Sequence, residues 1–85
     1  MEQRPGVDAE ELRASFLVLH EAEPELARAA VGRVLAIDSE RDYAHYLRAT
    51  LEARLGDAMA ARRAIADALR LKPGKALYLE FERNL

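Results

Sequence analysis

Apolar residues recur along this chain at the three- and four-residue spacing that is typical of amphipathic helices. No stretch shows the alternation of apolar and polar residues that a half-buried strand needs. Short helices joined by tight turns pack antiparallel to their neighbours, so the pattern predicts an all-α fold of five antiparallel helices. The helices are expected over residues 8–21 and 24–37, from Ser39 to about 55, from Asp57 to the stop at Pro73, and over residues 75–85.

Residues that start or stop helices set these bounds. Asp8 is expected to cap the first helix, and Pro24 suits the first turn of the second. Ser39, with Asp42 three residues later, resembles a capping box for the third helix. Gly56 can adopt the left-handed conformation that ends a helix.

The chain also repeats itself after a shift of 34 residues. The stretch AEPELARAAVGRVLAIDSER at 22–41 parallels GDAMAARRAIADALRLKPGK at 56–75, and Ala27 coincides with Ala61. A helix–turn–helix unit of this length is the period of the tetratricopeptide repeat. The chain therefore resembles two such repeats followed by one more helix.

The motif of the family can be followed residue by residue. Counting back from Pro73, its second-helix alanine, aromatic residue and turn glycine fall on Ala61, Ile65 and Gly56. The resemblance implies right-handed antiparallel helix–turn–helix repeats, as in a fragment of an α-solenoid. The expected segments are an N-terminal tail at 1–7, repeats at 8–41 and 42–75, and a C-terminal capping helix at 76–85.

The first helix of the second repeat departs from that motif. The family's tryptophan, leucine and tyrosine positions hold His45, Arg48 and Glu52, which share one face of the predicted helix. The other face is apolar and includes Tyr43 and Tyr46. Either the register of the helix is shifted, or the surface that lines the family's concave groove is itself apolar and is covered by something. We favour the second interpretation.

An apolar groove predicts that this is a protein-binding module, such as a scaffold or chaperone adaptor. The carboxylate clamp with which some tetratricopeptide modules hold chaperone C-termini is absent, because the aligned positions hold Leu12, Phe16 and Leu47. The expected ligand is a hydrophobic strand or amphipathic helix of a partner protein. The predicted binding residues are Leu12, Phe16, Leu19, His20, Tyr43, Tyr46, Thr50, Arg54, Leu77, Glu80 and Asn84.

Several of these residues also suit a structural role. Core packing is the expectation for Tyr43 and Phe81, whereas Phe16 and Tyr46 are the better groove candidates. Two repeats and one helix leave the ends of the stack uncovered, and arrays usually need about three repeats or a polar cap. A homodimer or other homo-oligomer, a tight partner and a longer parent repeat protein therefore stay open as alternatives.

The sequence does not predict an enzyme, a metal site or a cofactor. His20 and His45 lie on different predicted helices without the spacing of metal ligands, and no phosphate-binding loop is present. His45 is expected at the surface of its helix. The competing interpretation is an enzyme accessory domain that uses His45 with Asp42.

Charge and hydropathy narrow the partner class further. A net charge of −2 argues against nucleic acid as a partner. No apolar run reaches the ~18 residues of a membrane span, and the acidic N-terminus is unlike a signal peptide. A cytoplasmic location is therefore expected. Frequent alanine, with arginine in excess over lysine, suggests a bacterium with a GC-rich genome.

Overall fold

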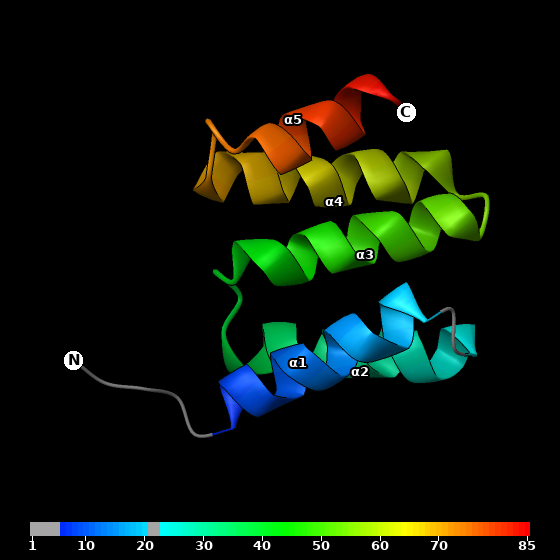
Figure 1. Ribbon diagram of the computed structural model, residues 1–85, viewed down its shortest axis with the longest axis vertical. Coiled ribbons are helices and arrows are strands. Elements are labelled where there is room, and N and C mark those ends of the chain that lie inside the picture. Colours follow the sequence, from blue (N-terminus) through cyan, green and yellow to red (C-terminus); the bar gives the residue numbers. More distant parts are fainter. Residues whose placement is uncertain (1–5, 21–22) are drawn as a thin grey trace.

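Within residues 6–20 and 23–85, which the computed structural model describes, the chain is all helical, with five helices and no strand (Figure 1). The all-α class and the number of helices are thus confirmed. Residues 1–5 of the expected N-terminal tail, and the expected end of the first helix at residue 21, lie outside the described residues. The helices are α1 (Val7–Leu19), α2 (Pro24–Ile37), α3 (Asp42–Arg54), α4 (Ala58–Leu71) and α5 (Ala76–Arg83).

The local signals at the start of α2 and between α3 and α4 act as the sequence predicts. Pro24 occupies the first turn of α2. Gly56 has a φ of 88°, which L-residues rarely adopt, and it turns the chain after α3. The carboxylate of Asp57 then accepts a hydrogen bond of 3.0 Å from the backbone N–H of Ala60, and so caps α4.

The expected caps of α1 and α3 are wrong, because tertiary contacts use their carboxylates. Asp8 lies inside the first turn of α1 and forms an ion pair with Arg41. No side chain caps α3, which begins after Arg41, so Ser39 and Asp42 do not form a capping box. Asp42 instead accepts a hydrogen bond of 2.5 Å from the hydroxyl of Tyr78.

Two apolar clusters form the core, and α3 belongs to both. Helices that follow one another in sequence pack together, and α1 also contacts α3. The first cluster joins α1, α2 and α3; its buried residues are Val7, Ala14, Val18, Ala27, Ala30, Val31, Val34, Ala44, Leu47 and Leu51. The second joins α3, α4 and α5; its buried residues are Ala49, Ala64, Ile65, Ala68 and Tyr78.

Two residues of the polar face of α3, His45 and Glu52, are buried, whereas Arg48 on the same face is exposed, so the expectation that His45 lies at the surface is wrong. His45 is 8% exposed and Glu52 is 7% exposed. Glu52 accepts hydrogen bonds of 3.2 and 3.3 Å from the guanidinium of Arg28 on α2. The Nε2–H of His45 donates to the carbonyl oxygen of Ser39 at 2.9 Å, and its Nδ1 lies 3.9 Å from a carboxylate oxygen of Asp67 on α4. The Arg28 guanidinium thus compensates the burial of Glu52, whereas His45 is hydrogen-bonded through Nε2 alone.

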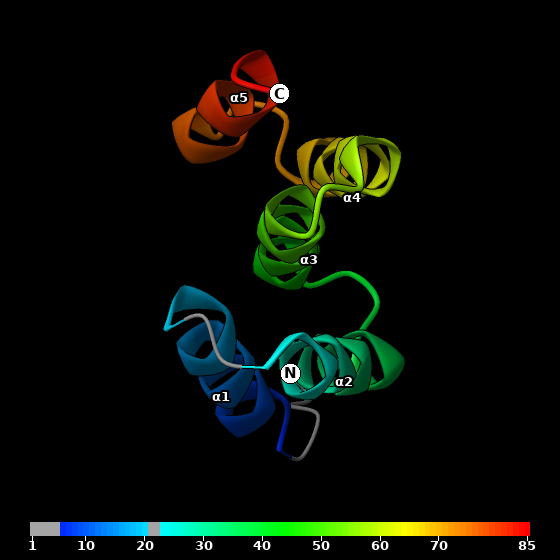
Figure 2. The same cartoon turned by 90° about the vertical axis from the view of Figure 1, so that its right-hand side faces the viewer.

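The helices form two layers. Seen from the side, α1, α3 and α5 lie in one layer and α2 and α4 in the other (Figure 2). Within the first layer α3 is set back between α1 and α5 (Figure 2). None of the described helices has the length and apolar character that crossing a bilayer requires.

Candidate protein-binding surface

The α1 stripe, defined as Leu12, Phe16 and Leu19, is the most exposed large apolar feature of the first layer. The exposed fractions of these side chains are 74%, 57% and 53%. Their spacing of four and three residues places them on one side of α1, while Ala14 and Val18 on the opposite side are fully buried in the first cluster. Helix α1 therefore has two apolar sides, and the fold covers only one of them.

Next to α1, four aromatic side chains form a row from α3 to α5. The centre of Tyr46 lies 5.7 Å from that of Tyr43 and 5.4 Å from that of Tyr78, and both pairs are stacked. Phe81 meets Tyr46 edge-on at 5.7 Å. These distances lie in the range of favourable aromatic pairs. The aromatic row therefore holds α5 against α3, with Tyr46 at its centre.

Tyr78 is the buried anchor of this row. Its side chain is fully buried, and burial together with the hydrogen bond to Asp42 raises the pKa of its hydroxyl far above the usual value. The hydroxyl therefore stays protonated and donates to Asp42. Tyr43 and Phe81, for which core packing was expected, are only half buried at the edges of the two clusters.

The N-terminal ends of α1 and α3 form an acidic end of this face. The hydroxyls of Ser15 and Tyr43 lie 3.3 Å apart and join the two helices. Beside them is an open depression of about 290 Å³, lined by Asp8, Glu11, Leu12, Ser15 and Tyr43. Burial raises the pKa of Glu11, and the nearby carboxylates of Asp42, Asp8 and Asp38 raise it further, whereas Arg41 lowers it. Glu11 thus lies among the carboxylates of Asp8, Asp38 and Asp42 and beside the guanidinium of Arg41.

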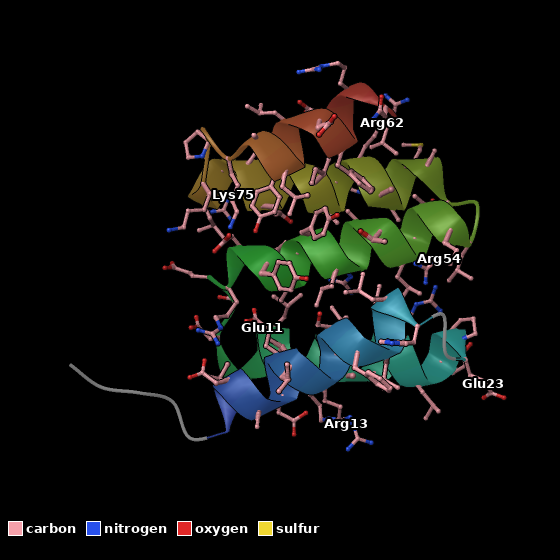
Figure 3. All side chains as sticks on the ribbon, in the orientation of Figure 1. Glu11, Arg13, Glu23, Arg54, Arg62 and Lys75 are labelled. Carbon is pink, nitrogen blue, oxygen red and sulfur yellow. The ribbon has the colours of Figure 1, made fainter. Side chains whose placement is uncertain are left out.

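The opposite end of the face is basic. Arg54 donates a hydrogen bond of 2.6 Å to the carbonyl oxygen of Val18 near the end of α1. The ring of His20 is tilted against that of Phe16, with 4.1 Å between the ring centres, and its Nδ1 contacts the Phe16 carbonyl oxygen at 3.0 Å. Glu11 and Arg54 lie toward opposite ends of the face (Figure 3). The surface is therefore electrically polarised along the direction of α1.

The eleven predicted binding residues divide into three groups. Leu12, Phe16, Leu19 and His20 on α1 are all exposed and close to one another in the helix. On α3, Tyr43, Tyr46 and Thr50 are half buried, and Thr50 donates to the Tyr46 carbonyl oxygen; Arg54 is exposed. Leu77 and Glu80 on α5 and Asn84 just after it are exposed, but the side chains that reach Tyr46 are those of Tyr78 and Phe81. Leu47, a clamp position by resemblance, is fully buried and cannot line a groove.

Sequence reasoning missed the acidic end. Neither Glu11 nor Ser15 is among the binding residues predicted from the sequence. Neither residue stands out in the sequence. They belong to the surface because they lie close to Tyr43, which follows Ser15 by 28 residues. The sequence does contain one signal of an acidic end. In VDAEELRASFLVL, three acidic residues come directly before the leucine that begins the α1 stripe.

Replacing Tyr46 with alanine is expected to lower the free energy of unfolding by about 2–3 kcal/mol, because one side chain makes three aromatic contacts in a half-buried position. Urea denaturation measures the loss. Tyr46→Phe keeps the ring and is the matched control, with an expected change within about 0.5 kcal/mol. If Tyr46→Ala and Tyr46→Phe were equally stable, the aromatic row would not hold α5 in place.

His45 lies beside Asp67 rather than pairing with Asp42. Its Nδ1 is buried without a hydrogen-bond partner, and Asp67 is the carboxylate nearest to it, while Asp42 is engaged by Tyr78. Across residues 6–20 and 23–85, no group of three or more potential ligand side chains could hold a metal ion.

Comparisons with known proteins add no family to this picture. No protein-family model, no curated protein and no solved structure matches the chain. Its assignment therefore depends on its own residues and geometry.

Proposed function

We propose that this chain is a protein–protein interaction module of the tetratricopeptide type, which binds an apolar segment of a partner protein across α1 and α3. The observation that carries the proposal is the exposed α1 stripe. Large apolar patches on a folded surface mark interaction sites more often than chance, and aromatic anchors dominate the energy of such sites. The stripe offers Phe16 at its centre, with the aromatic row beside it.

Several positions support the tetratricopeptide part of the proposal. The residue at the family's turn-glycine position, Gly56, has a positive φ, and both Ala61 and Ile65 are fully buried. His45 and Glu52, which replace two large family residues, are buried as those residues would be. The burial of these two residues argues against a register shift of α3, whereas Arg48 at the third of these motif positions is exposed. This burial favours the interpretation in which the other side of α3 lines an apolar groove.

Other finer assignments stay predictions: a scaffold or chaperone role, a bacterial source, a cytoplasmic location and the absence of enzymatic activity. The proposed binding role does not depend on any of these assignments, because it requires only that one face of the molecule bind a partner segment.

Replacing Phe16 with alanine is expected to weaken binding of amphipathic peptides by about 1–3 kcal/mol, roughly 5- to 150-fold, because it removes the central anchor. The free energy of unfolding should change by less than about 1 kcal/mol, since this side chain is 57% exposed. Peptides selected on the wild-type protein from a display library of helical sequences provide the ligand, and calorimetric titration measures the affinity.

Met59→Ala is the matched control for this test. Met59 is 69% exposed but lies on α4 in the other layer, so its loss should leave peptide affinity unchanged. Equal affinity of the selected peptides for the wild-type protein and Phe16→Ala would place the binding site elsewhere on the molecule.

A further inference from the structure

We infer that the segment held by this surface is an amphipathic helix that runs antiparallel to α1, with a Lys or Arg in its last turn against Asp8 and Glu11. The inference rests on the proposed function and specifies the chemistry of the partner.

A helical segment fits the α1 stripe better than an extended one. Its residues Leu12, Phe16 and Leu19 follow the rows along which helices pack against each other, and they span about 10 Å of helix. An extended segment would bring a row of backbone N–H and C=O groups to an apolar surface. The described elements beside it are helices, whose backbone groups are already bonded internally. A helical ligand satisfies its own backbone groups and presents only side chains.

The acidic end of the face selects a cation. Asp8, Glu11, Asp38 and Asp42 gather there around Arg41, which pairs with Asp8 and lies 3.5 Å from Glu11. The depression beside Leu12 and Tyr43 is open, so an ammonium or guanidinium group can approach the carboxylates while its aliphatic stem lies on the apolar stripe.

The basic end sets the direction of the ligand. No carboxylate pairs with Arg54 within residues 6–20 and 23–85, so its charge can meet an acidic residue of the partner. Helices are stabilised by acidic residues in the first turn and basic residues in the last. Only the orientation antiparallel to α1 places that favourable charge pattern of the ligand opposite Arg54 and Glu11 at once.

The α1 stripe of a second copy of this chain does not have the required charge pattern. The α1 helix of that copy carries the same apolar stripe and acidic residues in the first turn, but no basic residue in the last turn. Two α1 helices packed antiparallel would place His20 of the partner subunit, rather than a Lys or Arg, against Glu11. The charge pattern therefore favours a different protein over the pairing of two α1 stripes.

A display library of helices tests this inference. The library has helices of about 16 residues, long enough to match α1, with a fixed stripe of leucines and with Lys, Glu, Gln and Ser allowed at all other positions. Selection on the wild-type protein is expected to enrich Lys in the last turn and Glu in the first. Titrations of the enriched peptides into Glu11→Gln should show affinity lower by about fivefold, as for one exposed charge pair.

Glu10→Gln is the matched control, because it removes the same charge from the neighbouring residue, which pairs with Arg33 of α2. This variant should bind the enriched peptides as the wild-type protein does. Glu11→Gln is expected to fold at least as stably as the wild-type protein at neutral pH. A raised pKa means that the folded state favours the protonated carboxyl, so the ionised form destabilises it. The advantage of the variant should vanish as the pH falls below the unfolded pKa of glutamate, about 4.3.

The outcomes separate the inference from the proposed function. Enriched peptides with no charge preference, or equal affinity for Glu11→Gln and Glu10→Gln, would overturn the inference and leave the proposed function standing. No enrichment over a Phe16→Glu variant would overturn both. A wild-type dimer in sedimentation equilibrium that Phe16→Glu dissociates would show that a second copy occupies the stripe, and would also contradict the inference.

Discussion

Replacing Tyr78 with alanine is expected to lower the free energy of unfolding by about 3–5 kcal/mol, a large share of the 5–15 kcal/mol typical of a domain. The side chain is fully buried, stacks on Tyr46 and donates to Asp42. Helix α5 has only eight residues and cannot be stable without its tertiary contacts. Urea denaturation measures the loss, and hydrogen exchange should show α5 losing its protection first.

Two variants separate the parts of this effect. Tyr78→Phe keeps the ring and loses the hydrogen bond to a carboxylate, which costs about 1.5–3 kcal/mol. Leu77→Ala changes the neighbouring residue, which is 43% exposed, and should cost less than about 1 kcal/mol. A Tyr78→Ala protein as stable as Leu77→Ala would mean that α5 contributes little to the fold.

Replacing Leu47 with alanine is expected to cost about 2–5 kcal/mol, because the fully buried side chain lies in the first cluster among α1, α2 and α3. Many of its neighbours in that cluster are alanine and valine, which are too small to fill the cavity left behind. Thermal unfolding followed by circular dichroism measures the loss. Leu55→Ala is the control at the end of the same helix, where the side chain is 41% exposed, and it should lower the melting temperature far less.

The sequence predicts the helices of this protein well, because their bounds depend on local residues. Pro24, Gly56 and Asp57 act through their own backbone or through groups three residues away. The failures involve distant partners. The burial of Glu52 depends on Arg28, 24 residues earlier, and Asp8 pairs with Arg41, 33 residues later. Helical periodicity alone treats Glu52 as solvent-exposed and identifies no partner for Asp8.

In the candidate site, too, features set by local residues follow from the sequence, and features set by distant partners do not. The side of α1 that carries Phe16 follows from helical spacing once Ala14 and Val18 are placed in the core. The orientation of α5 does not follow, because the hydrogen bond from Tyr78 to Asp42 spans 36 residues and helps to fix the side of α5 that meets α3. For this reason Tyr78 and Phe81, rather than Leu77 and Glu80, make the contacts with Tyr46.

The sharing of α3 between the two clusters has a consequence for how the molecule opens. Helices α1 and α2 can separate from α3 without disturbing the second cluster, and α5 can separate without disturbing the first. Such partial openings require less free energy than complete unfolding, so the amides of α3 should be the last to exchange. A partner helix bound to both α1 and α3 would prevent the separation of α1 and α2 from α3. Binding should then make unfolding of the whole chain more cooperative. It should slow hydrogen exchange even at amides that the partner does not contact.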